Sequence, residues 1–232
     1  MGFGMNLVIE GTGIMRLLEG LPENSSPSLK SFRPPIADSA AGTSSSFQLA
    51  CLVEQIQRAT HEAKKLVFVR SEHDLTSRLE PGSWSVAECL DHLARTTLWF
   101  LPAISKATSI APKLTTSRPF RTGTIATLLI RNLEPPYRLR YKVLPQLVPQ
   151  EKNFEPAWSA FEESQSRLSE SVLSATGLAI DKVKVQCPVY ARITYNVYGA
   201  FRMLTAHERR HLWQIEQILK ALDRRGALKA AV

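Results

Sequence analysis

The stretch that decides the fold is GSWSVAECLDHL, residues 82–93, which has the pattern of the first turns of a long helix. Ser85 and Glu88 form the S-x-x-E pattern of a capping box, in which each side chain binds the backbone N–H of the other residue. A helix is therefore predicted to begin at about Val86. His92 then lies nearly two turns inside it.

A second helix-forming stretch, HERRHLWQ at residues 207–214, carries two histidines four residues apart. Because an α-helix has about 3.6 residues per turn, His207 and His211 lie on the same face. They interrupt a mainly apolar stripe whose other members are Ala200, Leu204, Gln214, Ile218 and Leu222. The spacing permits a shared ion without proving one.

His92, His207 and His211 are the candidate metal ligands. His92 shares a helix face with Cys89, Thr96, Trp99 and Ala103. Three inward imidazoles from two helices would supply three nitrogen ligands and leave a position open, as catalytic metal sites do. Binding needs neutral imidazoles, so occupancy should fall below about pH 6.5. The alternative is that each histidine is a hydrogen-bonded core residue.

The neighbours of the histidine pair are expected to have simpler roles. Glu208 points about 100° away from His207 around the helix, which predicts an exposed, salt-bridging side chain. Arg209 and Arg210 take the outward positions. Gln214, one turn beyond the second histidine, is predicted either to orient it or to close the core.

Other reactive or aromatic residues have packing or surface explanations. Trp84 and Cys89 stand at the positions of a hydrophobic staple around the capping box, which explains the cysteine without metal binding. The remaining candidates lie outside the histidine patterns: Trp99 and Trp213 are predicted to pack, and His61 and His73 to be exposed. The sequence contains no G-x-S-x-G nucleophile elbow, so it does not indicate a serine hydrolase.

Four long helices account for most of the chain. Residues 47–69 carry an amphipathic stripe, and a third helix opens around Asn153 to Pro156 and closes at Gly177. The final helix runs from an Asn196 cap to about Asp223, with Gly226 as its stop. The intervening stretches hold a short helix in TIATLLIRNL, residues 124–133, and a short extended segment in residues 181–195.

The predicted fold is all-α: an antiparallel four-helix bundle with a long crossover connection. The crossover spans residues 109–150, whose prolines are Pro112, Pro119, Pro135, Pro136, Pro145 and Pro149. The two short connections should pair the first helix with the second and the third with the fourth. The predicted domain organisation is a flexible Ser/Pro-rich leader at 1–45, the bundle at 46–226 and a tail at 227–232.

Charge and cysteine content limit the partners and the compartment. The net charge is +8, but the basic clusters are short: Lys64-Lys65, Arg138 to Lys142, Arg209-Arg210 and Arg224-Arg225. This favours a solvated surface over nucleic-acid binding. Three widely spaced cysteines indicate reduced thiols, and no signal peptide or membrane-length apolar run is visible, so a cytoplasmic protein is expected.

Two motifs carry a family resemblance. GSWSVAECLDHL is similar to the W-S-[IV]-x-E-[VIL]-[VIL]-x-H-L signature of the DinB/YfiT-like superfamily, and AHERRHLWQIEQIL, residues 206–219, resembles its closing H-x-x-x-H-x-x-Q helix. The resemblance spans roughly residues 47–224. It implies a four-helix bundle with a long crossover and a divalent metal held by His92, His207 and His211. Homodimers are common in the family.

The resemblance implies a metal-dependent enzyme that acts on a small-molecule substrate. A metal would activate water for hydrolysis or a low-molecular-weight thiol co-substrate for S-transfer. Imidazole ligands suit several divalent ions, with zinc and nickel ahead of iron and manganese. The alternative is a non-catalytic bundle that dimerises or binds a small hydrophobic ligand, with structural histidines. Neither general base nor substrate is defined by the sequence.

Overall fold

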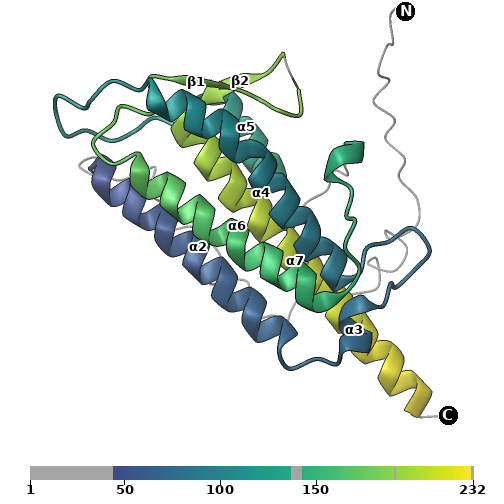
Figure 1. Cartoon of the computed structure of the whole chain (residues 1–232). Coiled ribbons are helices and arrows are strands. Elements are labelled where there is room, and N and C mark those ends of the chain that lie inside the picture. Colours follow the sequence, from purple (N-terminus) through teal and green to yellow (C-terminus); the bar gives the residue numbers. More distant parts are fainter. Residues whose placement is uncertain (1–43, 137–142, 191, 231–232) are drawn as a thin grey trace, which may run out of the picture.

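The computed structural model describes residues 44–136, 143–190 and 192–230, and four long helices dominate it (Figure 1). The predicted leader, apart from its last two residues, and the basic cluster at 138–142 lie outside the described residues. The long helices are α2 (Ser45–Val67), α4 (Val86–Ser109), α6 (Phe154–Ser174) and α7 (Val197–Ala230). They form one bundle, which confirms the predicted all-α four-helix-bundle class.

The predicted neighbours within the bundle were wrong. α2 and α4 each pack against α6 and α7, so α2 lies diagonally opposite α4, and α6 lies diagonally opposite α7. Phe68, after α2, packs edge-on against Phe154 and Trp158 at the start of α6, which makes α2 and α6 antiparallel. The segment between α2 and α4, with the short α3 (Glu72–Thr76), is long enough to cross the end of the bundle diagonally.

The crossover returns the chain to the starting end of α4, so α4 and α6 run in parallel. It contains α5 (Thr124–Leu133), where a short helix was predicted, and the 3-10 turn η2 (Pro145–Leu147). α5 packs along α7. The predicted extended segment is a hairpin, β1 (Lys184–Gln186) with β2 (Thr194–Asn196), antiparallel with Val185 opposite Tyr195.

Local capping fixes the starts of the two histidine-bearing helices. The N–H of Glu88 donates to Ser85 Oγ at 3.2 Å, and the N–H of Ser85 donates to Glu88 Oε2 at 2.9 Å, which confirms the capping box. Asn196 Oδ1 accepts from the N–H of Gly199 at 2.7 Å. The predicted stop at Gly226 was wrong: α7 continues to Ala230. One glycine costs a helix only about 1 kcal/mol, and its arginine, alanine and leucine neighbours favour helix.

Two apolar clusters fill the bundle, and a polar layer lies between them. One cluster includes Phe100, Leu168 and Phe201, and the other includes Leu93 and Phe161 among its members. Residues between these positions on α4, α6 and α7 are buried but polar: Thr96, Thr97, Ser164, Gln165, Glu208 and His211. The histidines of α7 thus lie inside the bundle, at the boundary of its two apolar halves.

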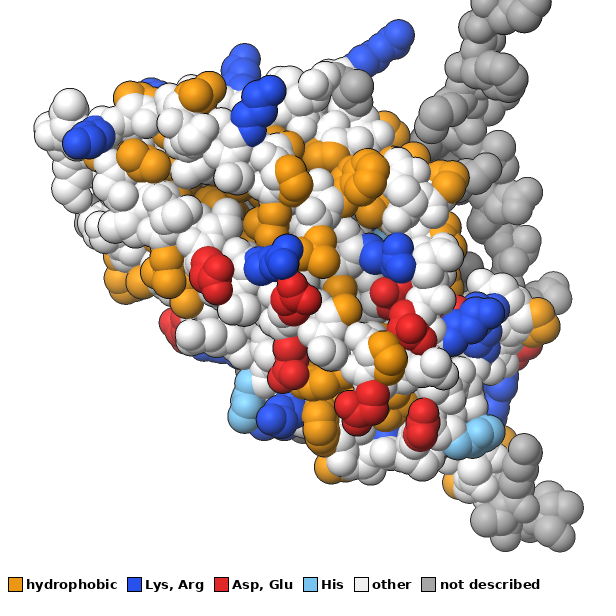
Figure 2. All heavy atoms as spheres, in the orientation of Figure 1, with side chains coloured by type: hydrophobic (Ala, Val, Ile, Leu, Met, Phe, Trp, Pro, Cys, Tyr) orange, Lys and Arg blue, Asp and Glu red, His pale blue; other side chains and the backbone are white. Residues whose placement is uncertain are grey.

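Within the described residues, no helix is long and apolar enough to cross a membrane. In the middle and lower part of Figure 2, basic side chains are interspersed with acidic ones, whereas the charged side chains near the top of the view are basic. Trp99 is 44% exposed, so its predicted packing role was wrong, whereas His61 and His73 are exposed as predicted.

Candidate metal centre

The three histidines of the sequence patterns meet inside the bundle. His92 comes from the second turn of α4, and His207 and His211 come from successive turns of α7. His207 Nε2 lies 3.3 Å from His92 Nε2 and 3.1 Å from His211 Nε2. All three ligand nitrogens lie within 4.8 Å of one another. The structure therefore brings together residues that are 115 positions apart in the chain.

The outer nitrogens of two rings are held by protein acceptors. His92 Nδ1 lies 2.7 Å from the carbonyl oxygen of Leu147, in the η2 turn of the crossover. His211 Nδ1 lies 2.9 Å from Gln214 Oε1, one turn further along α7. A carbonyl or amide oxygen can only accept, so each Nδ1 carries the proton. The Nε2 lone pairs of both rings therefore point inward.

The environment keeps the rings neutral. Burial lowers the pKa of His92, and it lowers the pKa values of His207 and His211 well below the usual range. The neighbouring imidazoles and the guanidinium of Arg210 add to the effect on His207 and His211, because each disfavours a further positive charge. Neutral imidazole is the form that binds metal ions.

This arrangement fits a divalent ion. In tetrahedral coordination with Zn–N bonds of about 2.0–2.1 Å, two ligand nitrogens are about 3.3 Å apart. The separations of His207 Nε2 from the Nε2 atoms of His211 and His92, 3.1 and 3.3 Å, are close to that edge length. Metal-binding histidines usually donate their other ring N–H to a protein acceptor, as these two rings do through Nδ1. The donor set, protonation and spacing thus suit the ion that the sequence predicted.

Trp84 forms part of the wall of this site, a role that sequence reasoning missed. Its ring centroid lies 4.7 Å from that of His92 and 6.1 Å from that of His211, with the latter pair stacked. The indole is half-buried. The staple position beside the cap at Ser85 explains this placement, because the residue before the cap folds back over the first turns of α4.

Glu208 is buried, and its predicted exposed role was wrong. Its side chain is 1% exposed, and its carboxyl oxygens have no hydrogen-bond partner among the described residues. Burial raises the pKa of Glu208 to about 8; Gln165 of α6 and Arg209 offset the rise only in part. The reason is that α2 and α4 both pack against α7. The face of α7 that lies between these two helices therefore points into the bundle.

Arg209 and Arg210 are also buried, at 7% exposure each, against the prediction that they point outward. The crossover helix α5 covers this side of α7. Arg209 Nε donates to Glu134 Oε2 at 3.0 Å, and its Nη1 donates to Gln55 Oε1 at 3.0 Å. Arg210 Nη1 donates to the carbonyl of Asn132 at 3.4 Å.

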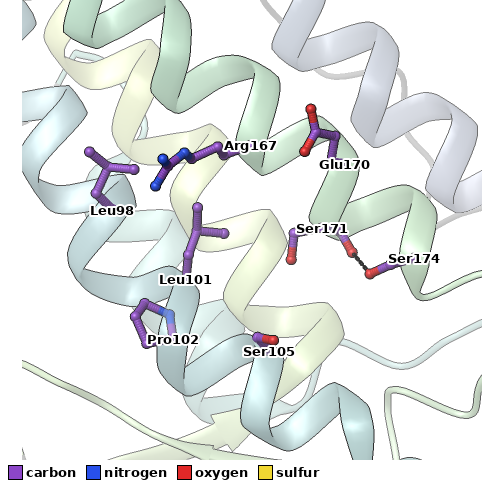
Figure 3. A pocket seen from close by; sticks show the side chains of 8 residues that line it. All are labelled: Leu98, Leu101, Pro102, Ser105, Arg167, Glu170, Ser171 and Ser174. Carbon is purple, nitrogen blue, oxygen red and sulfur yellow. Dashed lines mark hydrogen bonds between the residues drawn. The ribbon is translucent and has the colours of Figure 1, made fainter.

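A shallow groove on the outside of the bundle is separate from the histidines. It lies between α4 and α6, has a volume of about 420 Å³ and includes Leu98, Pro102, Arg167, Glu170 and Ser171 in its lining (Figure 3). Charged and hydroxyl side chains line much of it.

Comparisons with known proteins agree with the fold. The family model of the DinB superfamily matches residues 55–215, which include all three histidines. The solved structure of YfiT from Bacillus subtilis, described as a probable metal-dependent hydrolase with an unusual four-helix bundle topology, is similar. The match between the two structures has a TM-score of 0.52 at 11% sequence identity, and it covers 79% of this chain and 92% of the YfiT chain. No curated protein matches this sequence.

Proposed function

Because this chain belongs to the DinB superfamily, we propose that it is a metal-dependent enzyme whose divalent ion is bound by His92, His207 and His211. The observation that carries the proposal is the convergence of three imidazole Nε2 atoms, two of them on buried rings whose Nδ1 faces a protein acceptor. Three such ligands leave a coordination position for a reactant.

When bound, the ion would supply Lewis-acid chemistry that makes water or a low-molecular-weight thiol a nucleophile near neutral pH. The residues of the chain hold this centre in place. Leu147 and Gln214 fix the tautomers of His92 and His211, and burial keeps both rings uncharged. Trp84 covers one side of two rings and limits the access of solvent. A hydrolase or a thiol S-transferase would use the same centre.

The finer assignments follow from ligand chemistry and from the family. Three imidazoles suit zinc and nickel best, with iron and manganese as further candidates. The substrate is a small molecule, and in the transferase reading a low-molecular-weight thiol is the co-substrate. We place the protein in the cytoplasm, since Cys51, Cys89 and Cys187 are all free thiols. We also propose a homodimer, as in many relatives.

Metal analysis of protein purified without a histidine tag tests the proposal. We expect one equivalent of a transition metal in the wild-type chain, and its loss from the His207→Ala and His211→Ala variants. His61→Ala is the matched control, because His61 is exposed on α2 and stands apart from the cluster. Metal content that does not change when any of the three histidines is replaced would favour the non-catalytic alternative.

A further inference from the structure

Asp91 precedes His92 on α4 and binds the crossover rather than the solvent. Its side chain is 6% exposed. Asp91 Oδ2 accepts the backbone N–H of Gln150 at 2.7 Å and that of Glu151 at 3.2 Å, and it also accepts from Arg95 Nε at 2.7 Å. The ion pair with Arg95, one turn further along α4, would by itself be an ordinary salt bridge within a helix. The two amides show that this carboxylate also fastens the end of the crossover to α4.

The same stretch of crossover supplies the acceptor for His92. The Leu147 carbonyl that meets His92 Nδ1 lies three residues before Gln150, and the Leu147 side chain is buried. The η2 turn that carries Leu147 is closed by its own hydrogen bond, from the N–H of Val148 to the carbonyl of Pro145. Asp91 and His92, which are consecutive on α4, therefore both bind the backbone of one short segment of the crossover, residues 147–151.

We propose that Asp91 is a positioning residue of the metal centre. By fixing residues 150 and 151, it holds the Leu147 carbonyl against His92 Nδ1 and so keeps Nε2 of that ring directed at the other two histidines. This inference rests on the proposed function, because it assigns Asp91 a role in metal binding. The carboxylate acts through the crossover and touches no reacting atom.

Zinc affinity, measured by competition with a chromophoric chelator, tests this role. Loss of a group that orients a metal-bound histidine weakens metal binding about 10- to 100-fold, and we expect that loss for Asp91→Ala. Asp91→Asn should bind zinc nearly as the wild type does, because the amide oxygen can still accept both backbone N–H groups.

Asp181→Ala is the matched control. Asp181 is also buried, pairs with Arg118 through two hydrogen bonds and accepts the N–H of Arg121 at 3.3 Å. Its removal takes away the same kind of buried ion pair in a part of the protein that holds none of the three histidines. We expect a loss of stability without a change in zinc affinity.

Hydrogen exchange of residues 147–152 gives an independent readout. Exchange there should be faster in Asp91→Ala than in Asp181→Ala, and zinc should slow it in the wild type, since coupling between two sites is reciprocal. Three results would overturn the positioning role alone. They are equal zinc affinity in Asp91→Ala and the wild type, an equal loss of zinc affinity in Asp91→Ala and Asp181→Ala, and hydrogen exchange of residues 147–152 that does not change when zinc is added. A wild-type chain that binds no metal would overturn the proposed function, and this role with it.

Discussion

Replacing Glu208 with glutamine should stabilise the metal-free protein, by an amount that grows with pH. Burial raises the pKa of Glu208 from 4.5 to about 8, so the folded chain keeps a proton that the unfolded chain releases across this range. A raised pKa of this kind stabilises the fold fully below pH 4.5, and the benefit is lost as pH rises towards 8. Glutamine resembles the protonated carboxyl but does not titrate, so it avoids this loss.

The size of the effect follows from the pKa difference. Each pKa unit corresponds to about 1.4 kcal/mol, so at pH 7 the glutamine variant should be more stable by about 3 kcal/mol. Near pH 5 the difference should shrink to under about 1 kcal/mol. Since Glu208 adjoins His207, a bound ion would change the titration, and a chelator must therefore be present.

Urea unfolding at pH 5, 6, 7 and 8 measures the difference. Glu155→Gln is the control, because Glu155 is an exposed carboxyl in the first turn of α6. The control should track the wild type at every pH. If Glu208→Gln and wild type differ by the same free energy at all four pH values, the account of a protonated buried carboxyl is refuted.

Four further outcomes are expected. Gly199→Ala should destabilise the fold by about 1–3 kcal/mol in thermal or urea unfolding, because a Cβ there would lie 2.7 Å from Ala126 Cβ and 2.8 Å from the Thr122 carbonyl. Gly226→Ala, with open space around it, should instead stabilise α7 by up to about 1 kcal/mol; equal effects would contradict the packing argument. Gln214→Ala should weaken zinc binding about 10-fold in the chelator competition, and an unchanged affinity would argue against its orienting role. Because burial lowers the pKa values of the three histidines, metal occupancy should persist below pH 6.5, as a pH series of metal analyses can show; release between pH 7 and 6.5 would contradict this.

Local sequence patterns predicted the parts of the site that depend on single helices. The capping box of Ser85 and Glu88 determines where α4 begins, and so places His92 in its second turn. The four-residue spacing of His207 and His211 places both on one face. These features need only helix geometry and hydrogen bonding within one turn, which the sequence displays directly.

Features that depend on packing between helices could not be predicted in the same way. Glu208 is buried because α2 and α4 both flank α7, and the length of the α2–α4 connection alone does not reveal that diagonal arrangement. The acceptor of His92 is a backbone carbonyl, that of Leu147, which any residue type would provide. No side-chain pattern marks such a partner.

Anomalous X-ray scattering from crystals of the untagged protein tests the central claim most directly. The account predicts one strong anomalous peak within about 2.0–2.1 Å of Nε2 of His92, His207 and His211 if the ion is zinc, with the absorption edge identifying the element. A peak bound by other side chains, or no peak at this locus after soaking with stoichiometric zinc or nickel, would contradict it.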